Sequence, residues 1–268
     1  MNRIDAAFIR LSKAKQKAFI PYLAAGVPGT AETVELVLEL EKLGADLVEL
    51  GYPFSDPMAD GVVNQTAANR ALEKGVDVET YFAMVAEIRK HSQIPLIVFS
   101  YLNPIFKLGF GEFTRRAKAA GMDGILLVDM PVEESDELQA ACRREDLSLI
   151  FLAAPTTTPD RLDQVLKAGS GFLYYISRTG ITGEQDAFQA DFESKVAAIK
   201  KASQLPVVVG FGVSTPDHVR TVCRLADGVV VGSALVRRTL EKKPFAEILK
   251  DIKTLAAPLI APTKETWN

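Results

Sequence analysis

Two carboxylates, Glu49 and Asp60, are the residues of this 268-residue chain whose positions most strongly suggest chemistry. Glu49 lies in Leu47–Leu50, a short apolar run typical of a buried strand, and Gly51 and Pro53 end that run. Burying a carboxylate near the tip of a strand costs folding free energy unless the group is paired with a charge or serves in function. Glu49 is therefore predicted to be a general acid or base whose pKa is raised by an apolar site. The plainer alternative is a strand-end carboxylate paired with an arginine or lysine.

Asp60 is the second candidate, in the loop that follows the same strand. Its alternative role is an ordinary N-cap, because an aspartate before Gly61 at a helix start commonly fills that position. Asp56 is read most simply as a turn former, since a proline follows it, and Asp129 is a turn candidate of lower rank.

Other familiar active-site chemistries lack the residues they need. None of the expected strand ends carries a lysine, so a Schiff-base aldolase is not expected. The only histidines, His91 and His218, fall in helical segments, which argues against a zinc site, a histidine base or a Ser-His pair. Cys142 and Cys223 lie far apart in expected helices and suggest neither a disulfide nor a metal pair. Metal-free carboxylate chemistry remains, with tyrosines such as Tyr101 as possible supports.

Glycine-rich turns after the last two expected strands indicate a phosphate site. They lie in Val209–Val213 and in Val231–Leu235, where Ser233 is expected to cap a short helix. Backbone N–H groups and a helix dipole bind phosphate, and glycines let the backbone approach it. The plainer alternative is that these glycines only make tight turns. Ile176–Gly183 has the composition of a mobile lid, in which Gly183 would add a backbone donor. A phosphate ester is thus expected, and isomerisation, dehydration and C–C cleavage all stay open.

Eight short β-rich runs position these residues, with helical patterns between them, and most are continuously apolar, as strands covered on both faces should be. The expected strands are Ala18–Leu23, Leu47–Leu50, Leu96–Tyr101, Gly124–Val128, Ser148–Leu152, Phe172–Ile176, Val207–Val209 and Gly228–Val231. The expected helices are Thr30–Leu43, Ser135–Arg144, Thr158–Lys167, Phe192–Ala202, Thr215–Leu225 and Phe245–Leu255, preceded by an amphipathic helix within Met1–Lys17.

This α/β pattern has no linker and no shift in composition. It predicts a single (β/α)₈ TIM barrel over residues 1–268, with an extra N-terminal helix and a short phosphate-binding helix after the eighth strand. A doubly wound open sheet is the alternative, but its nucleotide-binding fingerprints are missing. Gly109–Gly111 lacks the third glycine of such a fingerprint and is expected to be a loop.

Composition excludes several functional classes. The net charge is −3 and no basic stripe carries interleaved aromatics, so a nucleic-acid partner is not expected. No apolar run approaches the roughly 18 residues of a membrane helix. The N-terminus could be read as a transit peptide, but Asp5 and the lack of a long apolar stretch favour a mature amphipathic helix. A cytoplasmic protein is expected. The segment Pro258–Asn268 is left open, either capping the barrel or loose.

The motif Glu49–Gly61 closely resembles the α subunits of tryptophan synthases, and the likeness spans essentially the whole chain. Further matching motifs are Phe19–Tyr22, Ser100–Pro104, Asp129–Glu133, Ala154–Thr157, Ser177–Gly183, Gly210–Gly212 and Gly232–Ser233. The resemblance implies a lyase of tryptophan biosynthesis. Such a lyase cleaves indole-3-glycerol phosphate by a retro-aldol step to indole and glyceraldehyde 3-phosphate.

The resemblance also implies residue roles. Glu49 would help protonate indole C3 and remove the proton from the hydroxyl next to the breaking bond, while Asp60 would bind the indole N–H and stabilise charge on the ring. Thr182 would help close the lid over Asp60. The expected substrate-binding residues are Tyr22 and Phe211 around the indole, Tyr174 (with Tyr175 as the alternative), Tyr101, and, around the phosphate, Gly183, Gly212, Gly232 and Ser233.

A partner follows from the same resemblance, namely a pyridoxal-phosphate-dependent β subunit that condenses indole with serine in an α₂β₂ complex. The loop Pro53–Asp60 and the region Asn103–Pro104 would face it. Pyridoxal phosphate is expected only in the β subunit, and no cofactor is expected in this chain.

Three residues depart from the family pattern. Asn64 replaces an apolar residue expected beside the indole, Val27 stands where an aspartate is common, and Tyr52 replaces a small aliphatic residue. They predict a slightly more polar pocket and altered coupling to the β subunit. Three alternatives stay open: a free-standing indole-releasing lyase, a catalytically weak subunit that activates the β subunit, and another phosphate-sugar isomerase on the same barrel.

Overall fold

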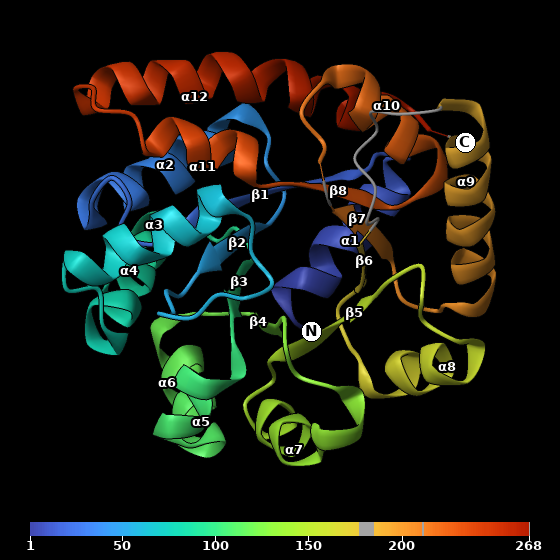
Figure 1. Ribbon diagram of the computed structural model, residues 1–268, viewed down its shortest axis with the longest axis horizontal. Helices are drawn as coiled ribbons and strands as arrows, with labels where there is room; N and C mark the ends of the chain where they lie inside the picture. Colours follow the sequence, from blue (N-terminus) through green and yellow to red (C-terminus); the bar gives the residue numbers. More distant parts are fainter. Residues whose placement is uncertain (177–184, 211, 268) are drawn as a thin grey trace.

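The computed structural model describes residues 1–176, 185–210 and 212–267, and in it eight parallel strands close into a barrel (Figure 1). The strands follow one another in chain order, and the eighth returns to pair with the first. They are β1 (Ala18–Ala24), β2 (Val48–Gly51), β3 (Leu96–Ser100), β4 (Gly124–Leu127), β5 (Ser148–Ala153), β6 (Leu173–Ile176), β7 (Val207–Gly210) and β8 (Gly228–Val231). The (β/α)₈ prediction is confirmed, each strand to within one residue at either end, and the open-sheet alternative is wrong.

Helices surround the barrel (Figure 1). They are α1 (Arg3–Lys13), α2 (Thr30–Leu43), α3 (Val62–Glu73), α4 (Val78–His91), α5 (Leu102–Leu108), α6 (Phe110–Ala120), α7 (Asp136–Arg144), α8 (Pro159–Ala168), α9 (Gln185–Ala202), α10 (Pro216–Leu225), α11 (Ser233–Thr239) and α12 (Phe245–Ile260). Within the described ranges, no helix is long and apolar enough to cross a membrane.

Every expected helix is present, and α4 ends at His91, which is expected in a helical segment, whereas α3, α5 and α6 have no expected range in the sequence pattern. The loop expected at Gly109–Gly111 is wrong in part. Only Gly109, at φ +88°, forms the turn, and its two successors begin α6.

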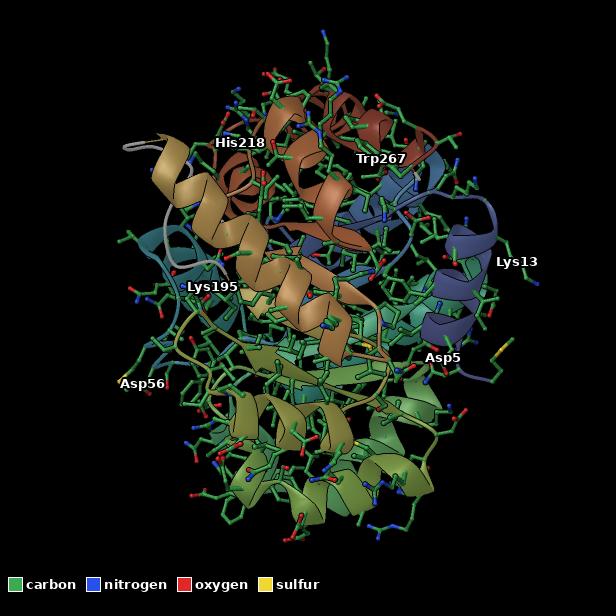
Figure 2. The ribbon with its side chains drawn as sticks, turned by 90° about the vertical axis from the view of Figure 1, so that its right-hand side faces the viewer. Asp5, Lys13, Asp56, Lys195, His218 and Trp267 are labelled. Carbon is green, nitrogen blue, oxygen red and sulfur yellow. The ribbon has the colours of Figure 1, made fainter. Side chains whose placement is uncertain are left out.

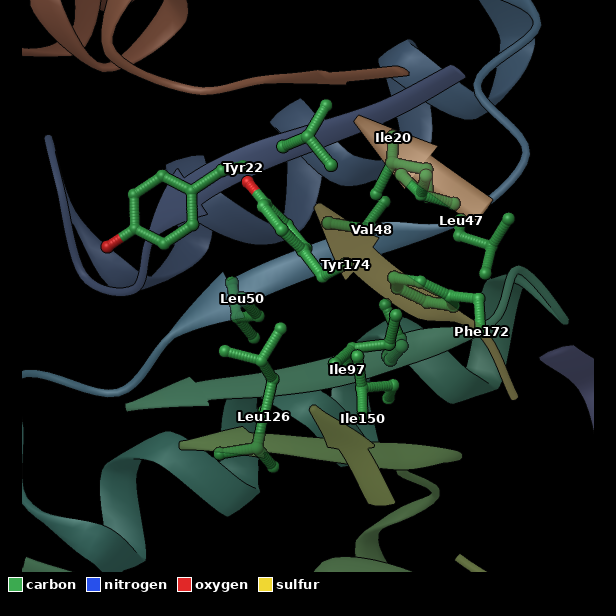
Figure 3. Packing of buried hydrophobic residues seen from close by; sticks show 14 of the residues in the cluster. Ile20, Tyr22, Leu47, Val48, Leu50, Ile97, Leu126, Ile150, Phe172 and Tyr174 are labelled. Atoms are coloured by element: carbon green, nitrogen blue, oxygen red, sulfur yellow. The ribbon is translucent and has the colours of Figure 1, made fainter. Parts of the chain in front are cut away.

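The barrel interior changes character along the strands. Alternate residues along extended chain face the same side. Leu47, just before β2, therefore faces the same side as Glu49, and Phe172, just before β6, faces the same side as Tyr174. In Figure 3 Leu47 and Phe172 lie at one end of the packed interior, and Tyr22 and Tyr174 lie at the other. The N-terminal end is therefore filled by apolar side chains, and polar groups are concentrated at the C-terminal mouth.

Helix α1 lies at the N-terminal end of the strands. Its Ile4 is fully buried beside Gly124 and Gly171, which begin β4 and precede β6. Figure 2 shows Asp5 and Lys13 of this helix at the opposite side of the molecule from Asp56, which belongs to the loop after β2. The two ends of the barrel thus present different elements to solvent.

The C-terminal segment is ordered against this same end. Helix α12 continues through Pro258 and is followed by a 3₁₀ turn, Ala261–Lys264. The backbone N–H of Trp267 donates to the carbonyl of Lys15 at 2.8 Å, and its indole N–H donates to the carbonyl of Pro262 at 2.9 Å. Of the two possibilities left open for the C-terminus, packing against the barrel is the one observed.

Four reciprocal clamps brace the strands at the N-terminal end. Each clamp joins a residue just before an even-numbered strand to a residue in the preceding odd-numbered strand. The side chain of the first residue accepts a hydrogen bond from the backbone N–H of the second. The backbone N–H of the first residue donates to the backbone carbonyl of the second. The four pairs are Asp46 with Phe19, Asp123 with Leu96, Ser170 with Leu149, and Asp227 with Val207.

Candidate active site

A cavity of about 490 Å³ opens at the C-terminal mouth of the barrel. Loops that follow several different strands contribute to its wall, as is usual for the catalytic face of this fold. The polar and glycine residues in its lining include Tyr22, Glu49, Asp60, Asn64, Tyr174, Gly212, Gly232, Ser233 and Arg237. The structure thus brings together residues that come from the first strand, the last strand and much of the chain between them.

Glu49 is a buried acid in the lining of this cavity. Glu49 of β2 lies opposite Tyr22 of β1, and the side chain of Glu49 is completely buried. Neither of its carboxyl oxygens has a hydrogen-bond partner among the described residues. Burial alone raises the pKa of Glu49 to about 8, because a charged carboxylate loses its hydration there. Glu49 is therefore protonated at neutral pH, and no described arginine or lysine pairs with it.

Asp60 is restrained on both of its carboxyl oxygens. The hydroxyl of Tyr101 donates to Oδ2 at 3.0 Å, and Nδ2 of Asn64 donates to Oδ1 at 3.3 Å. Partial burial raises the pKa of Asp60, while these two hydrogen bonds act in the opposite direction. The alternative role as an N-cap is wrong, because Gly61 occupies the cap position of α3.

Two tyrosines shape the pocket beside these acids, and glycines at strand ends make room for them. A methyl group on Gly51 would overlap the hydroxyl of Tyr22, and one on Gly210 would overlap the hydroxyl of Tyr174. Burial, together with the nearby carboxyl groups, raises the pKa of both phenols, so both stay neutral. Tyr175 follows on the other face of β6, and its ring lies against Phe192 of α9, with 6.3 Å between centroids.

The glycines and the serine of the predicted phosphate site line the same cavity. They are Gly212, Gly232 and Ser233. Ser233 is the first residue of α11 and Gly232 is its cap, so the expectation that Ser233 caps this helix is corrected by one position. Arg237, one helical turn beyond Ser233, also lines the cavity and was not predicted. Its signal in the sequence is the i, i+4 spacing from Ser233, which places both on one helix face.

Four of the predicted residues are not among the described residues that line the main cavity. Thr182, Gly183 and Phe211 fall outside the described residues, as does most of the expected lid. Tyr101 lines a narrow pocket behind Asp60 instead of the main cavity.

Of the three departures from the family pattern, only Asn64 lines the mouth cavity. The ring of Tyr52 packs against Tyr81, with 4.9 Å between centroids, and Val27 is buried beyond the end of the first strand. Asp129 accepts a hydrogen bond from the backbone N–H of Leu102 at 2.7 Å, which agrees with a structural role.

The arrangement is suited to acid–base chemistry on a substrate that carries an anionic group. A neutral carboxyl group can donate a proton, a second carboxyl group can stabilise a developing positive charge, and backbone N–H groups with an arginine can bind an anion. Across the described ranges, no group of three histidine, cysteine or acidic side chains could hold a metal ion.

Comparison with known proteins gives one consistent result. The family model described as tryptophan synthase alpha chain matches residues 8–260. The tryptophan synthase alpha chain of Opitutus terrae is 44% identical over 265 residues, covering 98% of this chain and all of the relative. The tryptophan synthase subunit alpha of Legionella pneumophila str. Paris superposes with a TM-score of 0.90 at 36% identity, covering 98% of each chain. A chain of the Pyrococcus furiosus tryptophan synthase α₂β₂ complex superposes with a TM-score of 0.85 at 38% identity, covering 92% of this chain and 99% of that one.

Proposed function

The chain belongs to the tryptophan synthase alpha chain family, and on that premise we propose how its own residues carry out the reaction. It is a lyase of tryptophan biosynthesis that cleaves indole-3-glycerol phosphate to indole and glyceraldehyde 3-phosphate, and the indole passes to a β subunit. The observation that carries the residue assignment is the fully buried, unpaired carboxyl group of Glu49 at the barrel mouth.

The proposed first step is protonation of the indole ring. Glu49 is neutral at working pH because its pKa is about 8, so it can transfer its proton to C3 of the indole. The ring nitrogen then carries positive charge, and the carboxylate of Asp60 stabilises that charge through the ring N–H. Without this protonation, the carbon of an indole ring would be a very poor leaving group.

The second step breaks the carbon–carbon bond. Glu49, now a carboxylate, takes the proton from the hydroxyl on the side-chain carbon attached to C3. The O–H electron pair becomes the C=O bond of the aldehyde, and the electrons of the C–C bond return to the ring and neutralise its nitrogen. Glu49 is thereby protonated again, so one carboxyl group serves as acid and then as base.

The remaining site residues are proposed to bind and enclose the substrate. Tyr22, Tyr174 and Phe211 surround the indole. Tyr101 contributes indirectly, by holding Asp60 through its hydrogen bond. The phosphate is bound by a second set of residues, which are Gly183, Gly212, Gly232 and Ser233. Thr182 closes over the site from the lid. Support comes from the cavity lining, where the two tyrosines belong to β1 and β6 and the lining glycines follow β7 and β8.

The β subunit is the partner of this chain, as in the α₂β₂ complex of Pyrococcus furiosus. We propose that pyridoxal phosphate belongs to the β subunit and that the partner binds over the loop Pro53–Asp60 and the region Asn103–Pro104. Support comes from exposed apolar side chains in and beside these segments, since Met58 is 89% exposed and Phe106 is 63% exposed. Met58→Asp should weaken activation by the β subunit and leave the rate of the lone chain unchanged.

We propose that residues 1–268 form one domain. Support comes from the closure of β1 onto β8 and from the packing of both chain ends against the same barrel. We also propose that the protein works in the cytoplasm, where its substrate and the indole-consuming partner are expected.

The deciding experiment is indole release from indole-3-glycerol phosphate by the purified chain, with and without a β subunit, for the parent and for Glu49→Gln. Slow release that rises with the β subunit and falls at least about a hundredfold in the variant is the expected result. Fast release by the lone parent would favour a free-standing lyase. Activation of the β subunit without any indole release would favour the regulatory alternative.

A further inference from the structure

Asn64 lies one helical turn after Asp60, on the first turn of α3, and lines the mouth cavity. Its Nδ2 donates to Oδ1 of Asp60 at 3.3 Å. Its own Oδ1 is buried and has no hydrogen-bond partner among the described residues. The amide is thus bonded at one end, to a carboxyl group of the site, and unpaired at the other.

The direction of this amide follows from the chemistry of Asp60. An ionised carboxylate only accepts hydrogen bonds, so the amide must turn its NH₂ group towards Asp60 and its oxygen away. The hydroxyl of Tyr101 approaches the other carboxyl oxygen at 3.0 Å. The two donors come from separate parts of the chain, α3 and the residue that links β3 to α5, so together they fix the plane of the carboxyl group.

We propose that Asn64 is a positioning residue for Asp60, which keeps the carboxylate ionised and turned towards the substrate ring. The inference rests on the proposed function, in which Asp60 stabilises positive charge on the indole. An unpaired carboxylate in a partly buried site would take up a proton more readily, and a protonated Asp60 could not stabilise that charge. Asn64 therefore acts on the reaction through Asp60 and not by touching the reacting atoms.

Other titratable groups line the two pockets that Asp60 also lines. They are the phenols of Tyr22, Tyr101 and Tyr174, the carboxyl group of Glu49 and the guanidinium group of Arg237. The three phenols stay neutral over the range that matters, because burial raises the pKa of each. Glu49 is neutral below about pH 8, so on the acid side of neutrality the ionisation of Asp60, whose pKa is raised by partial burial, is the relevant change on the protein.

The test is the pH dependence of kcat/KM for indole release between about pH 5 and pH 8, with indole-3-glycerol phosphate as the probe. In Asn64→Ile the acid limb of the profile should move up by about one pH unit, which corresponds to the loss of one hydrogen bond to a charged group. Asn64→Asp has the same size but replaces the donor by a second carboxylate, so its acid limb should move further. In both variants kcat should fall more than KM rises.

Asn69→Ile is the matched control, because Asn69 lies exposed on the same helix. Its profile should superpose on that of the parent. The substrate phosphate also titrates, near about pH 6, but it does so identically for every variant, and the differences between profiles isolate the protein group.

Two outcomes are separable. If Asp60→Asn abolishes activity while both Asn64 variants keep the parental pH profile, the positioning role is overturned and the proposed function stands. If Asp60→Asn keeps full activity, the proposed function itself loses its charge-stabilising residue. Should Asn64→Ile fail to fold, as judged by circular dichroism, the isosteric Asn64→Asp alone decides, and an unchanged acid limb there also overturns the inference.

Discussion

The hydroxyl of Tyr101 donates to Oδ2 of Asp60 at 3.0 Å, across 41 positions of the chain. The same hydroxyl oxygen accepts a hydrogen bond from the backbone N–H of Ala59 at 3.1 Å. One phenol therefore fixes both the carboxyl group and the backbone of the residue before it. The position of Asp60 depends on strand β3 as much as on its own loop.

Removing this hydroxyl should impair catalysis. In Tyr101→Phe we expect kcat/KM to fall about tenfold, since a hydrogen bond to a charged group contributes roughly 1.5–3 kcal/mol. Tyr52→Phe is the matched control, because Tyr52 also lines the narrow pocket behind Asp60 but packs by ring contacts with Tyr81. Steady-state assays of both variants on indole-3-glycerol phosphate make the comparison, and equal losses in the two would contradict the role given to the Tyr101 hydroxyl.

The reaction should slow in alkaline solution. The pKa of Glu49 is about 8 and the first step needs its protonated form, so kcat/KM should fall above that pH, approaching about tenfold per pH unit. A profile measured from about pH 7 to pH 10 on the isolated chain gives the midpoint. A rate that stays level over this whole range would mean that Glu49 does not begin the cycle as an acid.

Burial of Glu49 should cost stability, and the sign follows from linkage. The pKa is raised in the folded chain, so the unfolded chain loses its proton near pH 4.5 while the folded chain keeps it up to about pH 8. Stability of the parent is therefore reduced progressively as pH rises between these values. Glu49→Gln does not titrate and should exceed the parent in stability by a margin that grows to on the order of 4 kcal/mol at the upper value. Urea unfolding of both proteins at pH 4.5 and at about pH 8 measures the difference in unfolding free energy at each pH. An equal difference at the two pH values would contradict a buried, unpaired Glu49.

Arg237 should contribute to binding of the phosphate. In Arg237→Met we expect KM to rise about tenfold with little change in kcat, because the charge pair is present in both the ground and the transition state. Arg238→Met is the control, since Arg238 pairs with Glu241 at 2.8 Å. Kinetics at fixed ionic strength separate the two, and a fall in kcat alone would argue against a binding role.

The clamp at Asp123 should matter for stability and not for catalysis. Its side chain is 2% exposed and pairs with Arg89 at 2.7 Å, with Arg3 at 2.8 Å and with the N–H of Leu96 at 2.9 Å. Asp123→Asn should reduce the free energy of unfolding by about 3 kcal/mol, as expected when a buried charge pair is broken. Ser170→Ala, in an uncharged clamp, should cost about 1 kcal/mol. Denaturant unfolding and kcat are measured for both variants. A large loss of kcat would show that the clamps at the N-terminal end of the barrel also affect the site at its C-terminal mouth.

The strands can be predicted from the sequence because each is a continuous apolar run bounded by turn residues. The ranges of helices α3, α5 and α6 cannot, because α3 is weakly amphipathic and α5 and α6 are divided by Gly109 after only a few turns. The last helix extends beyond its expected end, since α12 accommodates Pro258 in its interior. Propensity and periodicity are local signals, and here packing against the barrel overrides them.

The candidate site is predictable to a similar degree. Glu49 is recognisable because a lone acid inside an otherwise apolar strand is costly to bury, and the glycine turns are recognisable by their place after β7 and β8. The contacts of Asp60 with Tyr101 and Asn64 depend on side-chain direction, and the place of Arg237 in the wall depends on the path of α11. The i, i+4 spacing indicates that Ser233 and Arg237 share a helix face, but it does not indicate that this face lines the cavity.

The reciprocal clamps have a consequence for how such a barrel can be divided. Each clamp joins an odd-numbered strand to the residue just before the even-numbered strand that follows. The barrel therefore contains four two-strand units, each with its own clamp. Junctions placed just before β3, β5 or β7 leave every clamp within one parent, whereas junctions within the helices that precede β4, β6 or β8 separate the two residues of a clamp. Chimaeras of two such barrels are therefore best assembled from quarters cut ahead of the odd-numbered strands.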